Sequence, residues 1–343
     1  MILGLLGRYG AAIALALAAI VPAQARESGL EAQFDSAFGT QVRAPRDFVA
    51  PSTGYNTPLE RELAQLAANT SGRIGIAAVD LATGQEVAVL GDQRFPMAST
   101  SKVAIAATFM AGVEQGRWTL DTQFPLRLAV PSRKLSSVVA PTRAGQMMSG
   151  RELIELAITR SSNPAADALL AAVGGPAAVN EWVHRAGILD FNLTRDIATL
   201  VRDDGVVDPA VQIDVRDSAT PRAMAQLVGG IYQGRWLTPA SRAVIVGAME
   251  RCRTGTHRLK AGLPEDATVA HKTGTLNNTA SDIGVITTPD GRQLAVAIYV
   301  TGQGGHAGRD AKIASLGRAI YDGYLSAPID GRQYASAAYG GQQ

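Results

Sequence analysis

The sequence predicts an α+β fold in which one five-stranded antiparallel sheet is flanked by helices and receives strands from both ends of the chain. The segments rich in β-formers lie at 73–80, 86–90, 269–275, 281–288 and 292–300. Between them, residues 99–232 are rich in alanine and leucine at helical spacing. A helix-rich segment between strand-rich flanks predicts an inserted all-helical domain, with a cleft where the two parts meet.

Periodicity justifies each element in chain order. Residues 26–57 mix Gly, Pro, Ser and Thr without a regular period, which predicts an extended leader. Pro58 begins a helix with one apolar stripe, and the hairpin of the first two strands follows it. The inserted segment contains helical stretches at 150–159, 164–172 and 177–184, and a last helix runs from Ile313 to Tyr324.

These elements define one domain with flanking segments. We predict a signal peptide at 1–25, the leader at 26–57, the domain at 58–325 and a flexible tail at 326–343. Within the domain, residues 58–98 and 233–325 form the α/β part and residues 99–232 form the helical part.

Composition excludes several classes of function. The 343 residues include 32 basic and 30 acidic ones, and neither sign forms a run, so nothing indicates binding to nucleic acid or to an anionic membrane. The single cysteine, Cys252, excludes an intrachain disulfide and a cysteine-based zinc site. The four histidines lack metal-binding spacing. We therefore expect neither a metal nor another cofactor.

The N-terminus has the pattern of a secretory signal peptide. Arg8 precedes an apolar run at 11–21, and small residues at 23–25 suit a cleavage site. This run is shorter than the roughly 20 residues that a membrane span needs. We expect cleavage after Ala25 and a monomer without stable membrane insertion, located in the periplasm or secreted.

A candidate nucleophile lies where the inserted helical segment begins. Ser99 and Lys102 are three residues apart, so they share one helical face and the amine can reach the hydroxyl. An amine whose pKa is lowered by burial can take the serine proton, and the serine N–H at a helix start can stabilise an oxyanion. A surface lysine after an N-cap serine has the same spacing, so the pair needs support from other motifs.

Two further motifs supply that support. The sequence Ser-Ser-Asn at 161–163 follows the helix at 150–159, in a turn that can also serve as a helix cap. The sequence Lys-Thr-Gly at 272–274 lies within the strand at 269–275, where small residues leave room for a ligand alongside the strand. Each motif alone is uninformative. Their order and their contexts of helix start, interhelical turn and strand predict one common site.

With these three motifs the chain resembles the penicillin-recognising serine enzymes, and most closely the class A β-lactamases. The resemblance runs from about Pro58 to Leu325 and includes matching stretches at 94–97, 174–176, 220–225 and 261–275. It implies a β-lactamase/transpeptidase-like fold, and a β-lactam or a cell-wall peptide as the substrate.

The resemblance also implies roles for four catalytic residues. Ser99 is acylated, and Lys102 assists its deprotonation. Ser161 relays a proton to the leaving nitrogen. Lys272 supports that relay and attracts the substrate carboxylate.

The remaining matches imply substrate-binding roles. Asn163 holds the side-chain amide of the substrate, and the N–H of Thr275 joins that of the nucleophile in an oxyanion hole. Arg258 matches an arginine that clamps the carboxylate together with a threonine, here Thr273 or Thr275, on either side of Gly274. A surface arginine after a turn is the alternative for this position.

The sequence departs from the family at positions that matter for the second half of hydrolysis. Class A members hold the deacylating water with a glutamate and an asparagine, but Ile197 and Val201 stand at those positions. The 23 residues from Arg195 to Asp217 contain no glutamate, although the two end residues can still pair. Ser162 replaces an aspartate whose usual work is structural.

A positioned general base contributes about 10²- to 10⁴-fold, so we expect competent acylation of the nucleophile and impaired hydrolysis of the acyl-enzyme. Either Asp203 or Asp204 replaces the base, or the two form an ordinary exposed turn. Two alternatives to a β-lactam hydrolase stay open. One is a D-alanyl-D-alanine carboxypeptidase or esterase of the penicillin-binding type, and the other is a protein that binds a β-lactam or cell-wall peptide without turnover.

Overall fold

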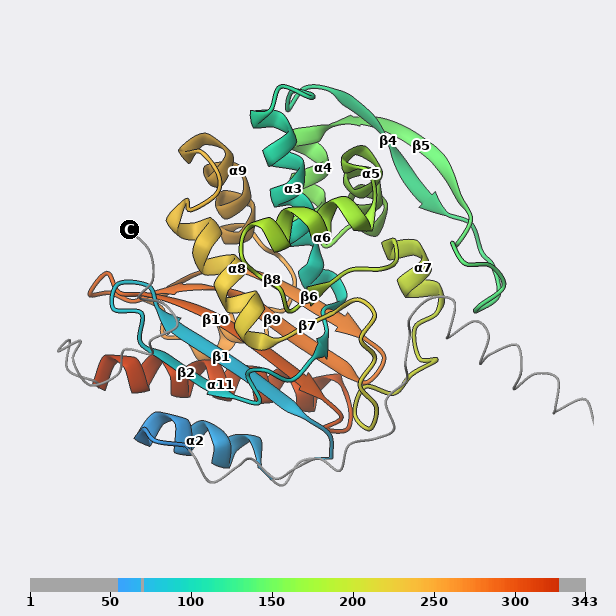
Figure 1. Ribbon diagram of the computed structural model, residues 1–343. Coiled ribbons are helices and arrows are strands. Elements are labelled where there is room, and N and C mark those ends of the chain that lie inside the picture. The colour runs from blue at the N-terminus through green and yellow to red at the C-terminus, as the bar shows by residue number, and fades with distance from the viewer. Residues whose placement is uncertain (1–54, 69–70, 327–343) are drawn as a thin grey trace, which may run out of the picture. The chain divides into compact units, whose positions relative to one another are not determined.

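The computed structural model describes residues 55–68 and 71–326. Its sheet has the strand order β2-β1-β10-β9-β8, and every neighbouring pair is antiparallel. Strands from both chain ends therefore pair, with β1 beside β10 (Figure 1). The α+β class and the five-stranded sheet predicted from the sequence are confirmed. The predicted signal peptide, the leader up to residue 54 and the tail beyond Ser326 lie outside the described residues.

The sheet strands closely follow the segments predicted from the sequence. They are β1 (Ile74–Asp80), β2 (Glu86–Val89), β8 (Thr268–Leu276), β9 (Thr279–Thr287) and β10 (Gln293–Thr301). Side chains alternate between two cores: Ile76 pairs with Ile298 in one, and Ala77 pairs with Ala297 in the other. Because both faces of the sheet are covered, β1 is buried along its whole length.

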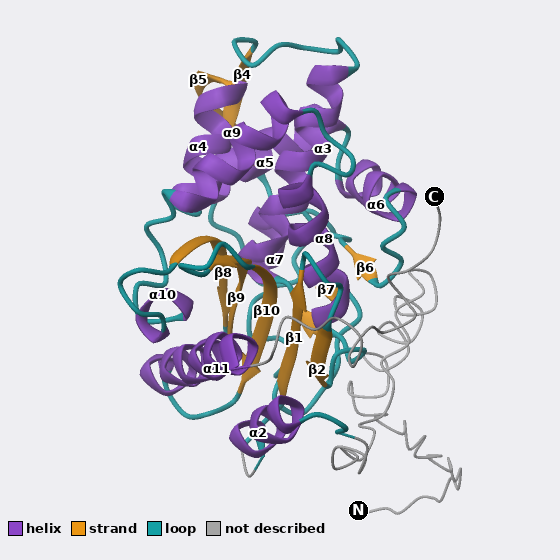
Figure 2. Cartoon of the chain, turned by 90° about the vertical axis from the view of Figure 1, so that its left-hand side faces the viewer, coloured by secondary structure: helices purple, strands orange, loops and turns teal. Residues whose placement is uncertain are grey.

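Helices cover the two faces of the sheet. On one face lie α2 (Pro58–Ala67) and α11 (His306–Ser326). The short α10 (Leu259–Gly262) packs against α11. On the other face lie α8 (Pro221–Gln233) and α9 (Pro239–Glu250) (Figure 2). Among residues 55–68 and 71–326, no helix combines the length and apolarity that a membrane crossing requires.

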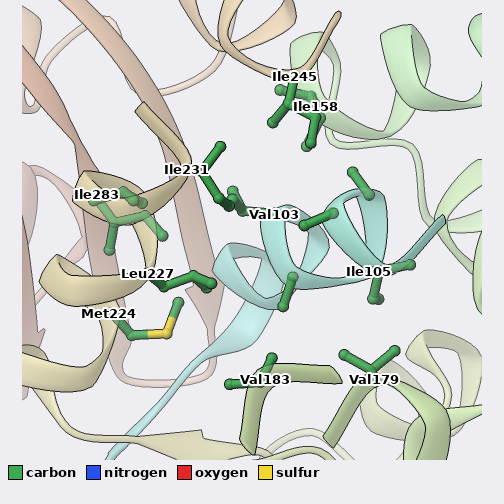
Figure 3. Close-up of a cluster of buried hydrophobic side chains, with 14 of the residues drawn as sticks. Val103, Ile105, Ile158, Val179, Val183, Met224, Leu227, Ile231, Ile245 and Ile283 are labelled. Carbon is green, nitrogen blue, oxygen red and sulfur yellow. The ribbon is translucent and has the colours of Figure 1, made fainter. Parts of the chain in front are cut away.

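A buried helix occupies the centre of the helical part. The 3-10 turn η1 (Ala98–Ser101) leads into α3 (Lys102–Glu114), which is made of small and apolar residues on all sides. A helix with no polar face must be surrounded by other elements. Figure 3 shows Val103 and Ile105 of α3 near side chains of the helices around it. Lys102, in the first turn of α3, is 0% exposed.

Four more helices complete the helical part. They are α4 (Gly150–Thr159), α5 (Asn163–Val173), α6 (Pro176–Arg185) and α7 (Ile197–Arg202). Ser149 and Glu152 form a capping box at the start of α4, and the Ser162 hydroxyl caps α5.

The inserted segment is not all helical, which corrects the prediction. It contains a two-stranded ribbon of β4 (Gln123–Ala129) and β5 (Thr142–Ser149), visible at the top of Figure 1. Strands β6 (Phe191–Asn192) and β7 (Ser218–Ala219) form a small sheet with β3 (Phe95–Pro96). The ribbon is partly exposed on both faces and has an irregular register, so its sequence lacks the alternation that reveals a half-buried strand. In addition, α8 packs on the sheet although it lies within residues 99–232.

Candidate active site

Ser99 lies in a turn that strand β8 approaches very closely. Ala98, directly before it, has a φ of 48°, a left-handed conformation that is rare for residues with a side chain. A Cβ atom at Gly274 of β8 would lie 2.8 Å from the Met97 carbonyl oxygen and 3.1 Å from the Ala98 Cβ. Only glycine permits this approach, which brings the Lys-Thr-Gly strand beside the serine.

Lys102 connects the serine turn to the second motif. Its Nζ lies 3.0 Å from Ser99 Oγ and 3.2 Å from Ser161 Oγ. The same nitrogen donates to the Ser161 carbonyl oxygen and to Asn163 Oδ1, both at 2.7 Å. Because these two oxygens only accept, they can occupy both N–H groups of a neutral amine and leave its lone pair for the serine hydroxyl.

The surroundings of Lys102 favour that neutral form. Burial lowers the pKa of Lys102 well below its ordinary value, and the neighbouring positive charge of Lys272 lowers it further. The carboxylate of Asp167 acts in the opposite direction. A neutral amine beside a serine hydroxyl can act as a general base.

Ser161 lies between the two lysines. It has a φ of 56°, so its backbone is in the left-handed region at the turn between α4 and α5. Lys272 donates to Ser161 Oγ at 3.0 Å and to the Thr273 carbonyl oxygen at 2.8 Å. A hydroxyl oxygen that accepts from a lysine keeps its own proton available for another acceptor. Ser161 can therefore donate into the site.

Lys272 is fully buried, yet charges around it keep much of its positive charge at neutral pH. Burial lowers the pKa of Lys272 to about 8, whereas Cys252 and Asp282 raise it and Arg258 lowers it. An ammonium group in this position offers a charge-assisted hydrogen bond to an anionic substrate group.

Arg258 is buried rather than exposed on the surface, and its threonine partner is Thr275. The guanidinium binds Asp310 at 2.7 Å and donates to the carbonyl oxygens of Gly274 and Ser281. Its Nη2 donates to Thr275 Oγ1 at 2.7 Å. A guanidinium cannot accept, so the exposed Thr275 hydroxyl keeps its proton for a ligand.

Ile197 and Val201, the two positions that the resemblance pointed to in the long loop, carry apolar side chains in α7. Ile197 is 2% exposed and belongs to the main hydrophobic core, while Val201 is 46% exposed. The Asp167 carboxylate accepts from the N–H groups of Ile197 and Ala198, at 2.7 and 2.9 Å. Neither apolar side chain can hold a water molecule.

Sequence reasoning missed Asp167. Burial raises its pKa to about 7, although hydrogen bonds from the Ile197 and Ala198 N–H groups lower it. Asp167 lies one helical turn after Asn163, on a stretch that is otherwise alanine and leucine. A lone acid on the inward face of such a helix is the signal that could have revealed it.

The two aspartates considered as replacement bases make their hydrogen bonds elsewhere. Asp203 accepts from the Arg202 guanidinium and from the Leu135 N–H, and Asp204 accepts from the Asn277 N–H. These hydrogen bonds attach the loop between Arg195 and Asp217 to the backbone at Leu135 and Asn277. Burial raises the pKa of Asp203, but the Arg202 and Leu135 hydrogen bonds outweigh it, and the resulting low pKa makes a weak base.

The neck of that loop closes as the sequence predicted. Arg195 Nε lies 2.5 Å from Asp217 Oδ2. Asp217 also accepts from the Thr194 and Arg195 N–H groups, so one buried carboxylate holds both ends of the loop together.

Comparison with known proteins gives consistent matches. The family model of the beta-lactamase enzyme family matches residues 58–324. Beta-lactamase CTX-M-8 of Citrobacter amalonaticus is 31% identical over 281 residues, which cover 80% of this chain and 92% of that protein. Beta-lactamase Toho-2 of Escherichia coli is 32% identical over 269 residues, which cover 77% and 89%.

Solved structures agree with the sequence matches. An ancestral class A β-lactamase superposes with a TM-score of 0.66 at 39% identity, covering 77% of this chain and 99% of that one. A β-lactamase from Chitinophaga pinensis gives 0.67 at 27% identity, covering 78% and 100%. With the clustered serines and lysines inside the matched region, this chain belongs to the beta-lactamase enzyme family as a class A β-lactamase-like serine hydrolase.

Proposed function

We propose that the protein opens β-lactams through an acyl-enzyme on Ser99 and releases the acyl group slowly. The observation that carries this proposal is the contrast between the two halves of the site. Lys102 lies within hydrogen-bond distance of the Ser99 hydroxyl, whereas the loop offers Ile197 where a base is needed.

Acylation follows from the proton positions. Neutral Lys102 takes the Ser99 proton as Oγ forms a bond to the carbonyl carbon of the lactam. The carbon–nitrogen bond of the ring breaks, and the nitrogen receives the proton of Ser161. Lys102, whose Nζ is 3.2 Å from Ser161 Oγ, then returns its extra proton to that oxygen. The amine ends neutral, and one proton has moved from the nucleophile to the leaving nitrogen.

The other groups bind and polarise the substrate. The backbone N–H groups of Ser99 and Thr275 form the oxyanion hole, a contribution of roughly 3 to 4 kcal/mol per donor. Lys272 and the Thr275 hydroxyl, held by Arg258, bind the carboxylate. Asn163 contacts the side-chain amide of the substrate through the NH₂ group that its bond to Lys102 leaves free.

Deacylation lacks an equivalent base. A water molecule must lose a proton as it attacks the ester, and the carboxylates nearby already hold backbone N–H groups. Loss of a positioned base costs about 10²- to 10⁴-fold. The acyl-enzyme therefore accumulates during turnover.

The direct test mixes the purified protein with a chromogenic cephalosporin and weighs it intact. We expect a fast burst of absorbance, a slow steady state and one acyl adduct that peptide mapping places on Ser99. Ser99→Ala, which keeps the fold and lacks the hydroxyl, should give neither burst nor adduct. A parent protein without any adduct would end the proposal.

A second candidate is a D-alanyl-D-alanine carboxypeptidase of the penicillin-binding type. Ile197 favours it, because such an enzyme does not need the class A glutamate. Incubation with a cell-wall pentapeptide distinguishes the two. Release of D-alanine at a rate above that of β-lactam turnover would favour the peptidase, and absence of release supports the β-lactam hydrolase.

We also propose that the protein acts in the periplasm or outside the cell. The support is the charge, apolar run and small-residue site within residues 1–25. N-terminal sequencing of the protein from the periplasmic fraction should begin near Arg26. A mature chain that still begins at Met1 would contradict export by cleavage.

A further inference from the structure

A buried polar cluster behind the Lys-Thr-Gly strand takes no part in the chemistry above. His271 Nδ1 lies 2.9 and 3.0 Å from the two carboxylate oxygens of Asp282 on β9. Cys252, which follows α9, hydrogen-bonds the same imidazole. All three side chains are buried. Within residues 55–68 and 71–326, no group of such side chains has an arrangement that could hold a metal ion.

Two hydroxyl groups connect this cluster to the site. Cys252 Sγ lies 3.3 Å from Thr254 Oγ1, and that oxygen lies 2.5 Å from Thr273 Oγ1. Gly255 keeps the turn close: its φ is 67°, and a Cβ there would lie 2.4 Å from the Thr273 methyl carbon. A chain of hydrogen bonds therefore runs from the buried Cys252 thiol to Thr273, the residue after Lys272.

The direction of the hydrogen bonds in this chain depends on one proton. Each hydroxyl has a single proton to donate, and a thiolate can only accept. A thiolate at Cys252 makes Thr254 donate to sulfur, so Thr273 must donate to Thr254 and has no proton left for a ligand. With a thiol, Thr254 is free to donate to Thr273, and the Thr273 proton is available.

We propose that Cys252 is a positioning residue whose proton decides whether Thr273 donates a hydrogen bond to the substrate carboxylate. This inference rests on the proposed function, because the carboxylate to which Thr273 would donate is the one that Lys272 and Thr275 bind there. When Cys252 loses its proton to water, the S–H bond breaks, the two hydroxyls rotate and no other covalent bond changes.

The groups around Cys252 place the loss of its proton near neutral pH. Burial raises the pKa of Cys252, but hydrogen bonding and charge from His271, hydrogen bonding from Thr254 and the charge of Lys272 lower it to about 7. Burial lowers the pKa of His271, yet Asp282 raises it to about 10, so the imidazole stays protonated.

Other charges around this chain act on Lys272. They are Asp282 of β9 and Arg258 at the start of α10, and Lys272 in turn lowers the pKa of Lys102 of α3. The thiolate itself also stabilises the Lys272 ammonium, which favours binding of a carboxylate. This direct charge effect has the opposite sign to the loss of the Thr273 donor, so the two are separable by experiment.

The test measures the second-order rate constant for Ser99 acylation by a carboxylate-bearing chromogenic cephalosporin from about pH 5 to about pH 9. We expect a fall of about tenfold as Cys252 ionises near pH 7 in the parent and in Thr254→Ser, which keeps the hydroxyl. Thr254→Val and Cys252→Ser should lack this fall, so their rates relative to the parent should rise with pH. Dividing the Thr254→Val and Thr254→Ser profiles by that of the parent cancels the shared titrations of Lys102 and Lys272, because these variants keep the thiol whose charge acts on Lys272.

Because the chain has one cysteine, ultraviolet thiolate absorbance reports directly on Cys252. The proposal predicts a titration near pH 7 that matches the kinetic fall. The proposal would be overturned if the acylation rate constant of Thr254→Val still fell near pH 7, or if the Cys252 thiol did not ionise between about pH 5 and about pH 9. Adduct formation without any fall near pH 7 contradicts this inference only, whereas absence of an adduct at every pH contradicts the proposed function.

Discussion

The serine–lysine cluster and the loop from Arg195 to Asp217 lie in the same molecule but differ in how they use polar groups. In the cluster, hydroxyls and amines from the turn before α3, α3 itself, the 161–163 turn and β8 lie within hydrogen-bond distance of one another. In the loop, the carboxylates of Asp203 and Asp217 accept from backbone N–H groups, and the side chain of Ile197 is buried in the core. Under the proposed function, this difference separates the groups that make an acyl-enzyme from the groups that would hydrolyse it.

The largest effect should come from replacing Lys102, the general base of the serine–lysine cluster. Lys102→Arg keeps hydrogen-bond donors but stays protonated and cannot deprotonate the serine, so acylation should fall by about 10⁴-fold, at the upper end for a general base. The rate of the burst measures this, with thermal unfolding as a check that the variant folds. Near-parental acylation by this variant would show that another group takes the Ser99 proton.

The next effect concerns the loop. Ile197→Glu places a carboxylate where the family has one, and deacylation should rise by about 10²-fold, the lower end for a positioned base. The matched control is Ile197→Gln, which has the same shape without the base and should stay slow. Equal steady-state rates for the two variants would mean that the missing glutamate does not limit turnover.

A smaller effect is expected at the carboxylate clamp. Thr275→Val removes the hydroxyl that Arg258 holds, and the acylation rate constant should fall by about tenfold through loss of one hydrogen bond to a charged group. Thr275→Ser retains the hydroxyl and the backbone N–H, so it should restore the rate. A serine variant as slow as the valine variant would show that the clamp is not the cause.

The smallest effect on activity, but a clear effect on stability, should come from replacing Asp167, whose carboxylate binds the N–H groups at the start of α7. Asp167 keeps its proton to about pH 7 when folded but loses it near 3.8 when unfolded, so the free energy of unfolding falls as pH rises between these values. The fall is up to about 4 kcal/mol. Asp167→Asn should therefore gain stability relative to the parent as pH rises from about 4 to about 7.

Chemical denaturation at several pH values measures this difference. Asp196→Asn, at the N-cap of α7, is a graded control because asparagine caps as well as aspartate but removes a charge that raises the pKa of Asp167. It should reduce the fall of stability with pH without abolishing it. If the free energies of unfolding of Asp167→Asn and the parent differ by the same amount at all pH values, burial is not the cause of the raised pKa of Asp167.

Local signals explain what the sequence could predict. The turn before Ser99, the turn at Ser161 and the strand of Lys272 each carry a short motif in a recognisable context, so their convergence followed from order alone. Runs rich in β-forming residues located the sheet strands within their true bounds or next to them. The pairing of Arg195 with Asp217 was also predictable, because the two mark the ends of one loop.

Features that depend on contacts between distant segments were not predictable. The pairing of His271 with Asp282 requires the register of β8 against β9, and the interaction of Cys252 with His271 requires the position of α9. Asp167 is recognisable as a loop anchor only when α7 packs over it. The ribbon of β4 and β5 was missed because leucine and methionine in it suggest a helix.

The central claim is that acylation outruns deacylation, and the lifetime of the acyl-enzyme tests it most directly. The protein is mixed with a penicillin, freed of excess ligand and weighed intact at intervals. We predict an adduct that forms fast and decays at least about 10²-fold more slowly than it forms. Continuous rapid consumption of penicillin with no accumulated adduct would contradict the claim.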